Sequence, residues 1–117
     1  MILVLSTDPV AAALLGALVE TLGFVVHFAG ATESADQSIR RARPRVLLVD
    51  CADPVSCSRE VLGRAAMRGV AVVIFGTGEA LGRVSELVHE HQLDTLLMPP
   101  DAQTLRATLE RAMQRAG

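Results

Sequence analysis

The sequence predicts an α/β protein with a doubly wound parallel sheet, and two observations carry that prediction. Five short apolar runs recur at nearly even intervals, at residues 2–5, 24–28, 46–49, 70–75 and 95–97, and each is followed by a stretch with helical features. Such alternation builds a parallel sheet with helices on both faces. Ligands of these sheets bind beyond the carboxyl ends of the strands. The single acidic residue Asp50, which follows the third run, therefore lies where a functional site is expected.

Length and charge restrict the class of protein. A chain of 117 residues is expected to form one domain, residues 1–117, with a sizeable core. Its 11 basic and 13 acidic residues give a net charge of -2, which lacks the positive excess that nucleic acid or an anionic membrane attracts. All basic residues are Arg, so no amine is present to form a Schiff base or to clamp a phosphate. We expect no nucleic-acid partner and no membrane partner.

The cysteines and the N-terminal run predict a cytoplasmic protein. Cys51 and Cys57 lie six positions apart, without the spacing of a zinc site or a thioredoxin-type motif. The first apolar run is too short to span a membrane and has no basic leader. These patterns predict a soluble protein with reduced thiols.

The first predicted helix begins at Pro9, with Asp8 as its N-cap, and ends before Gly23. Its buried stripe at helical spacing is expected to be Val10, Leu14, Ala17, Leu18 and Thr21. A second helix is expected from a cap at Thr32 to about Ala42, before Pro44.

The middle of the chain predicts a turn over 51–54 and then a third helix, which ends at Gly69. This helix is expected to run through Val55, Val61, Leu62 and Met67. The fourth strand, 70–75, is almost wholly apolar, which is typical of a central parallel strand.

After the fourth strand, residues 76–78 lead into one helix whose apolar face has Leu81, Val84, Leu87 and Val88. The fifth strand ends near Met98, and Asp101 is expected to cap a last helix. Leu105, Leu109 and Ala112 are predicted to face the core from that helix.

Three segments of the chain together resemble the receiver domain of bacterial response regulators, along its full length. They are the run 2–5 followed by Asp8-Pro9, the string 46–50 with Pro54 four residues on, and 98–101 at the end of the fifth strand. The resemblance implies a receiver-like, flavodoxin-like (βα)5 sheet with strand order 2-1-3-4-5. It also implies that Asp50 occupies the position of the aspartate that accepts a phosphoryl group.

The chain departs from this family in the residues that handle metal and phosphate. The two adjacent acidic residues that help to hold magnesium in the family correspond to Ser6 and Thr7, and the family's phosphate-binding Lys corresponds to Met98. One carboxylate and two hydroxyls are a poor set of ligands for Mg²⁺. The family's hydroxyl position after the fourth strand is Gly76 or Thr77, depending on the alignment. The degenerate metal and phosphate site around Asp50 is therefore expected to contain Ser6, Thr7, Asp8, Ala52, Gly76, Thr77 and Met98.

Several of these residues have a structural interpretation beside the functional one. Asp50 either accepts a phosphoryl group or accepts hydrogen bonds from Ser6, Thr7 or a nearby backbone amide. Asp8 is a better helix cap than metal ligand, and Asp53 is either a second carboxylate at the site or, more commonly, an exposed turn residue. Cys51 is either a redox-sensitive thiol or a structural one.

The predicted function is phosphorylation-independent binding to another protein, without enzymatic activity and without a cofactor. A charge-assisted hydrogen bond contributes about 1.5 to 3 kcal/mol, whereas a two-state switch needs roughly 5.5 kcal/mol of differential binding. Phosphorylated Asp50 would have too few partners to drive the switch. The expected contact surface, for a protein partner or for a second copy in a homodimer, is the fourth helix, fifth strand and fifth helix. Its candidate residues are Arg83, Glu86, Glu90, Arg106 and Glu110.

Two alternatives remain at this point. The first is a weakly active receiver that binds Mg²⁺ and takes phosphate at Asp50 from a histidine kinase. The second is a small-ligand binder or enzyme on the same scaffold, which predicts a defined pocket at the strand ends.

Overall fold

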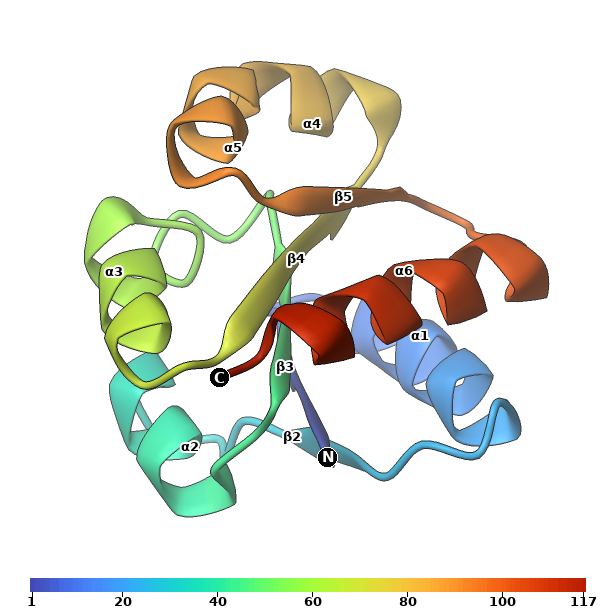
Figure 1. The fold of residues 1–117 in the computed structure, drawn as a ribbon, viewed down its shortest axis with the longest axis horizontal. Coiled ribbons are helices and arrows are strands. Elements are labelled where there is room, and N and C mark those ends of the chain that lie inside the picture. The colour runs from blue at the N-terminus through green and yellow to red at the C-terminus, as the bar shows by residue number, and fades with distance from the viewer.

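The computed structural model describes residues 1–117 and contains one five-stranded parallel sheet (Figure 1). The strand order is β2-β1-β3-β4-β5, as the resemblance implied. The strands are β1 (Ile2–Leu5), β2 (Val26–Phe28), β3 (Val46–Asp50), β4 (Ala71–Gly76) and β5 (Asp94–Leu97). In the register, Leu5 lies beside Val49 and Asp50 beside Phe75, so the carboxyl ends of the three central strands meet at one edge.

Helices cover both faces of the sheet (Figure 1). One face carries α1 (Pro9–Thr21) and α6 (Ala102–Arg115). The other carries α2 (Ala35–Ala42), α3 (Arg59–Met67), α4 (Gly78–Arg83) and α5 (Ser85–His91). Alternate residues of β1 enter the two cores: Leu3 and Leu5 on the α2 and α3 side, Ile2 and Val4 on the α1 and α6 side. This burial on both faces explains the continuous apolar runs of the central strands.

Most of the predicted buried stripe of α1 was wrong, because only Leu18 of its five residues is partly buried and packs against the core. Leu15, Gly16 and Val19 face the sheet, whereas Val10 is 75% exposed and Leu14 is also exposed. The helix has no charged residue before Glu20, so no polar face fixes its rotation in the sequence. Close contact decides the rotation instead, because a side chain at position 16 would collide with the ring of Phe28.

Two helix starts also differ from the prediction. Helix α2 is capped by Ser34 rather than Thr32, because Ser34 and Gln37 form a reciprocal capping box. Helix α3 begins at Arg59 after the cap Ser58, so Val55 lies in the preceding turn and is exposed. Its last residue, Met67, is exposed as well.

The single fourth helix of the prediction is two helices, α4 and α5, which meet at Val84. The break follows Gly82, a residue of low helix propensity, and Val84 departs from helical geometry at φ -108° and ψ 14°. The second strand is also shorter than predicted, since β2 begins at Val26.

The remaining helix ends agree with the prediction. Asp8 caps α1 ahead of Pro9, and Asp101 caps α6. Gly23 and Gly69 have positive φ angles of 93° and 72° after α1 and α3. None of the helices has both the length and the apolar character that a membrane crossing requires.

Candidate functional site

Asp50 is the last residue of β3 and is only 7% exposed. The hydroxyl of Ser6 donates to its Oδ2 at 2.7 Å, and the backbone amide of Ala52 donates to Oδ1 at 2.9 Å. The Ser6 hydroxyl itself accepts from the amide of Asp8 at 3.1 Å. These contacts confirm that the carboxylate accepts hydrogen bonds from Ser6 and a nearby amide, although Thr7 takes no part.

Asp50 has no cationic partner. Eight ion pairs occur in the structure, and none includes this residue. A buried carboxylate without an opposite charge is costly, and hydrogen bonds offset only part of that cost. Asp50 is thus a buried acid held by two neutral donors.

The two neighbouring aspartates have structural contacts. Asp8 Oδ1 accepts from the amides of Val10 at 3.0 Å and Ala11 at 3.3 Å, which confirms its prediction as a helix cap. Asp53 is only 5% exposed, so its prediction as an exposed turn residue was wrong. Its Oδ1 accepts from the amides of Val55 and Ser56, which turns the side chain inward.

A cavity of about 220 Å³ opens beside Asp50 at the carboxyl ends of β3 and β4. Its walls are mainly apolar, and they carry two carboxylates and no basic side chain. The lining residues are Thr7, Asp8, Ala11, Asp50, Cys51, Ala52, Phe75, Gly76, Thr77, Ala80 and Met98. Six of the seven residues predicted around Asp50 line this cavity, and the seventh, Ser6, contacts Asp50 directly.

Four lining residues were not predicted as site residues: Ala11, Cys51, Phe75 and Ala80. Ala11, Phe75 and Ala80 are apolar, so no chemical signal marks them in the sequence, and Cys51 was considered only as a thiol beside Asp50. The spacing from the helix starts could have indicated Ala11 and Ala80, since both lie in the first turn of helices that begin at this end of the sheet.

The donor atoms near Asp50 do not fit magnesium. The structure contains no group of three or more His, Cys, Asp or Glu side chains that could hold a metal ion. Mg²⁺ demands octahedral oxygen ligands, usually from carboxylates and water. The hydroxyl of Ser6 is already engaged with Asp50, and the carboxylate of Asp8 caps α1. The receiver-type metal site therefore lacks its second carboxylate.

The residues on the far side of the cavity are also engaged or apolar. Thr77 Oγ1 accepts from the amide of Ala80 at 3.2 Å as the cap of α4. A side chain at Gly76 would collide with the thiol of Cys51. Met98 follows β5 and offers a thioether where the family has an ammonium group.

Both thiols are buried, and both have a raised pKa. Burial raises the pKa of Cys51, and the charge of Asp50 raises it further. Burial also raises the pKa of Cys57 to about 11. The thiolate is the reactive form of cysteine, so these shifts favour the structural interpretation of both residues.

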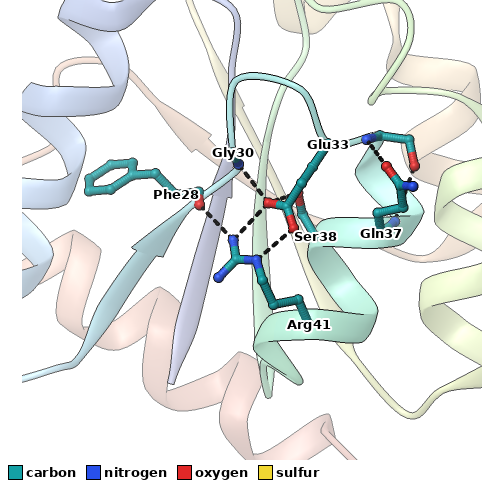
Figure 2. Close-up of polar contacts among 7 residues, drawn as sticks. Phe28, Gly30, Glu33, Gln37, Ser38 and Arg41 are labelled. Atoms are coloured by element: carbon teal, nitrogen blue, oxygen red, sulfur yellow. Dashed lines mark hydrogen bonds and ion pairs between the residues drawn. The ribbon is translucent and has the colours of Figure 1, made fainter.

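A second carboxylate near this end of the sheet has a full set of partners (Figure 2). The guanidinium of Arg41 contacts both oxygens of Glu33, at 2.6 Å from Nε and 2.9 Å from Nη2, and also donates to the carbonyl of Phe28. Gly30 and Ser38 donate to the same carboxylate at 2.8 and 3.2 Å. The hydrogen bonds from Arg41, and then from Gly30, lower the pKa of Glu33 to about 2. The sequence does not mark this cluster, because the eight-residue separation of Glu33 and Arg41 is not a helical pairing distance.

The five residues of the predicted contact surface are all exposed. Two of them already have partners: Arg83 pairs with Glu79 at 2.7 Å, and Glu90 pairs with Arg59 of α3 at 2.9 Å. Beside them, a groove of about 530 Å³ runs between α4, α5 and the edge strand β5. Its lining includes Leu81, Val88, Leu93 and Thr95.

Comparisons with known proteins find relatives in structure only. No protein-family model matches the sequence, and no curated protein matches it either. A response regulator receiver domain protein from Clostridium thermocellum is 21% identical, with a TM-score of 0.74 over 97% of this chain and 94% of that one. The signal receiver domain of a modulated diguanylate cyclase from Desulfovibrio desulfuricans G20 is 24% identical, with a TM-score of 0.72 over 98% and 94%.

A signal receiver domain from Vibrio parahaemolyticus, described as that of a Luxo repressor protein, is 19% identical to the chain. Its TM-score is 0.75, over 98% of this chain and 90% of that one. At these identities the similarity establishes the fold. The chain has the receiver fold, and its site around Asp50 differs from the magnesium and phosphate site that the resemblance to receiver domains implied.

Proposed function

We propose that this chain is a receiver-like signalling module that acts by binding another protein, without catalysis and without accepting a phosphoryl group. The observation that carries the proposal is the environment of Asp50. Its carboxylate accepts from Ser6 and Ala52, and its cavity is lined by two carboxylates and no basic residue. A phosphoryl group would enter a negative site without a counter-charge, and this disfavours it.

The free energy available from contacts at Asp50 supports the same proposal. Each charge-assisted hydrogen bond to a phosphoryl group contributes about 1.5 to 3 kcal/mol, and a full switch needs roughly 5.5 kcal/mol. With Ser6, Thr7 and Met98 in place of two carboxylates and an ammonium, the only groups that donate hydrogen bonds to Asp50 are a neutral hydroxyl and a backbone amide. Signalling as the general role follows from the receiver fold of the structural neighbours.

The contact surface that we propose is formed by α4, α5, β5 and α6. It includes Arg83, Glu86, Glu90, Arg106 and Glu110, and beside them lies the groove against β5. The outer edge of β5 has no neighbouring strand, and Leu97 on this strand is 60% exposed. An edge strand with free backbone groups and an adjacent groove can accept a segment of a partner chain.

The alternative, phosphorylation of Asp50 by a histidine kinase, is tested by chemical phosphorylation. The chain is incubated with Mg²⁺ and acetyl phosphate, and separately with Mg²⁺ and beryllofluoride, and is followed by intact mass and amide NMR. We expect no added phosphoryl mass and no shifts around Asp50. Stoichiometric modification with shifts that reach α6 would overturn the proposal.

A triple variant, Ser6→Asp with Thr7→Asp and Met98→Lys, is the matched positive control. It returns the two carboxylates and the amine to the cavity, so it should gain Mg²⁺-dependent modification. The control makes a negative result in the natural sequence interpretable, because it shows that the scaffold and the reagent are competent.

The contact surface is tested by self-association, since a second copy is one of its two proposed partners. Sedimentation over a concentration series compares the natural chain with Leu97→Glu on β5 and Leu14→Glu on the exposed face of α1. A dimer that Leu97→Glu weakens supports the β5 surface. A dimer that only Leu14→Glu weakens would move the contact to α1.

A further inference from the structure

We propose that the cavity beside Asp50 binds a small organic cation, an ammonium or amidinium group on a compact apolar body. This goes beyond the proposed function and rests on it only in that Asp50 stays unphosphorylated. The ligand would occupy the place that a phosphoryl group and its metal take in receivers.

The charge of the cavity favours a cation. Asp50 is 7% exposed, lines the cavity, and receives hydrogen bonds only from the neutral donors Ser6 and Ala52. Asp8 adds a second carboxylate to the lining. The charge of Arg83 lowers the pKa of the neighbouring Cys51. Arg83 is nevertheless paired with Glu79 at 2.7 Å and forms no ion pair with Asp50. A cationic ligand would supply the missing opposite charge.

Asp50 retains capacity to bind such a group. An ionised carboxylate has about four acceptor sites, and the structure uses one on each oxygen of Asp50. An ammonium or amidinium group can donate to the remaining sites. These charge-assisted bonds are stronger than bonds between neutral groups.

The first turn of α1 does not offer free donors to an anion. Asp8 Oδ1 accepts from the amides of Val10 and Ala11, and the Asp8 carbonyl accepts from Ala12. The first residue of the helix is Pro9, which has no amide proton. The amide groups that usually attract anions to a helix N-terminus are therefore already hydrogen-bonded to Asp8.

The walls and the size of the cavity define the rest of the ligand. Ala11, Phe75, Ala80 and Met98 make most of the lining apolar. The volume of about 220 Å³ is below the roughly 300 to 1,000 Å³ of pockets for drug-sized ligands. An apolar cavity of roughly 150 Å³ holds benzene. One ring or a short branched chain with a single cationic arm fits these limits, and the mainly apolar lining offers few oxygen ligands to Mg²⁺.

The test uses benzylammonium as the probe and benzyl alcohol as its neutral counterpart of similar shape. Both are titrated into the ¹⁵N-labelled chain and followed by amide NMR. We expect saturable shifts for benzylammonium at Asp50, Ala52 and Gly76, with benzyl alcohol about tenfold weaker or more. Absence of saturable shifts with benzylammonium, or equal binding of the alcohol, would overturn the inference.

Variants assign the preference to one carboxylate. Asp50→Asn should abolish the preference for the charged probe, and Asp53→Asn, at a buried carboxylate outside the cavity, should leave it unchanged. Met98→Lys provides a second variant, since its ammonium should fill the cavity and block the probe. A preference that survives both Asp50→Asn and Met98→Lys would contradict the proposed site.

A titration with Mg²⁺ alone separates this inference from the proposed function. Saturable Mg²⁺ shifts at Asp50 would overturn both, because they would restore the ordinary receiver chemistry. Failure of benzylammonium to bind, with no effect of Mg²⁺ either, overturns only the cation site.

Discussion

Glu33 and Asp50 are two carboxylates near the same end of the sheet, and the fold treats them in opposite ways. Glu33 lies in the loop between β2 and α2, partly exposed, and is held by a two-point contact with Arg41 and by two further donors (Figure 2). Asp50 is more deeply buried and has no cation. The more exposed acid, Glu33, has a counter-charge, whereas the more buried acid, Asp50, has none.

This difference separates a structural acid from a candidate functional one. The contacts of Glu33 connect a loop to α2, and its partners are Gly30, Ser38 and Arg41. Asp50 borders a cavity, and its surroundings break the usual rule that buried charges are paired. Such local conflicts concentrate at functional sites, so the predictions below test how different the two acids are.

The largest expected effect belongs to the serine that supports Asp50. Ser6→Ala removes the donor to Asp50 Oδ2, and loss of a hydrogen bond to a buried charged group costs about 1.5 to 3 kcal/mol. Denaturant unfolding at pH 7 measures the change in the free energy of unfolding. Thr7→Ala is the matched control, because Thr7 is exposed and makes no side-chain hydrogen bond; it should stay within about 0.5 kcal/mol of the natural chain. Equal losses in the two variants would contradict the role of Ser6.

An intermediate effect is expected from Arg41 in acid. The pKa of Glu33 is lowered to about 2 from 4.5, so its contribution to stability is complete above about pH 4.5 and is lost as the pH falls towards 2. Arg41→Gln removes the main cause of the shift. Unfolding measured between about pH 5 and pH 2 should therefore show a smaller loss of stability in the variant than in the natural chain.

Two other acids with lowered pKa, Glu90 and Asp101, titrate alike in both proteins and cancel in this difference. The Arg41–Glu33 contact is partly exposed, so high salt should make the difference in stability loss between the variant and the natural chain smaller. Parallel pH profiles at low salt would show that Arg41 does not stabilise the charged form of Glu33.

The smallest expected effect is on the reactivity of Cys51. The charge of Asp50 raises the Cys51 pKa, second to burial, so Asp50→Asn should speed alkylation by iodoacetamide, by less than about tenfold. Measurement in a Cys57→Ser background isolates the one thiol. Glu33→Gln should leave the rate unchanged, and an unchanged rate in Asp50→Asn would indicate that Asp50 carries no charge next to the thiol.

The sheet could be predicted from the sequence because its central strands are buried on both faces and read as unbroken apolar runs. The rotation of α1 could not, because thirteen residues with a single charge define no polar side. The burial of Leu15 and Val19 and the close approach of Gly16 to the ring of Phe28, contacts between separate elements, define it. The break at Val84 follows Gly82, and a single glycine lowers helix propensity without requiring that the helix end there.

The site was predictable where chemistry marks residues and not where packing does. Asp50 stands out by its position at the end of the third strand, the resemblance to receiver domains pointed to Ser6 and Met98, and the structure brings all three to one end of the sheet. The burial of Asp53 depends on a turn that folds inward, and the apolar walls made by Ala11 and Ala80 depend on where two helices start. The pairing of Glu33 with Arg41 requires the loop geometry itself.

The central claim is that Asp50 contributes to binding rather than to stability. Its most direct test compares two isosteric substitutions, Asp50→Asn and Glu33→Gln, by unfolding at pH 7. An Asn at position 50 can accept from Ala52 and donate to the Ser6 hydroxyl, which can turn to the Asp8 carbonyl 3.4 Å away. We predict that Asp50→Asn leaves the free energy of unfolding unchanged or raises it by about 0.5 to 2 kcal/mol, whereas Glu33→Gln lowers it. A loss of stability in Asp50→Asn as large as that in Glu33→Gln would contradict the account.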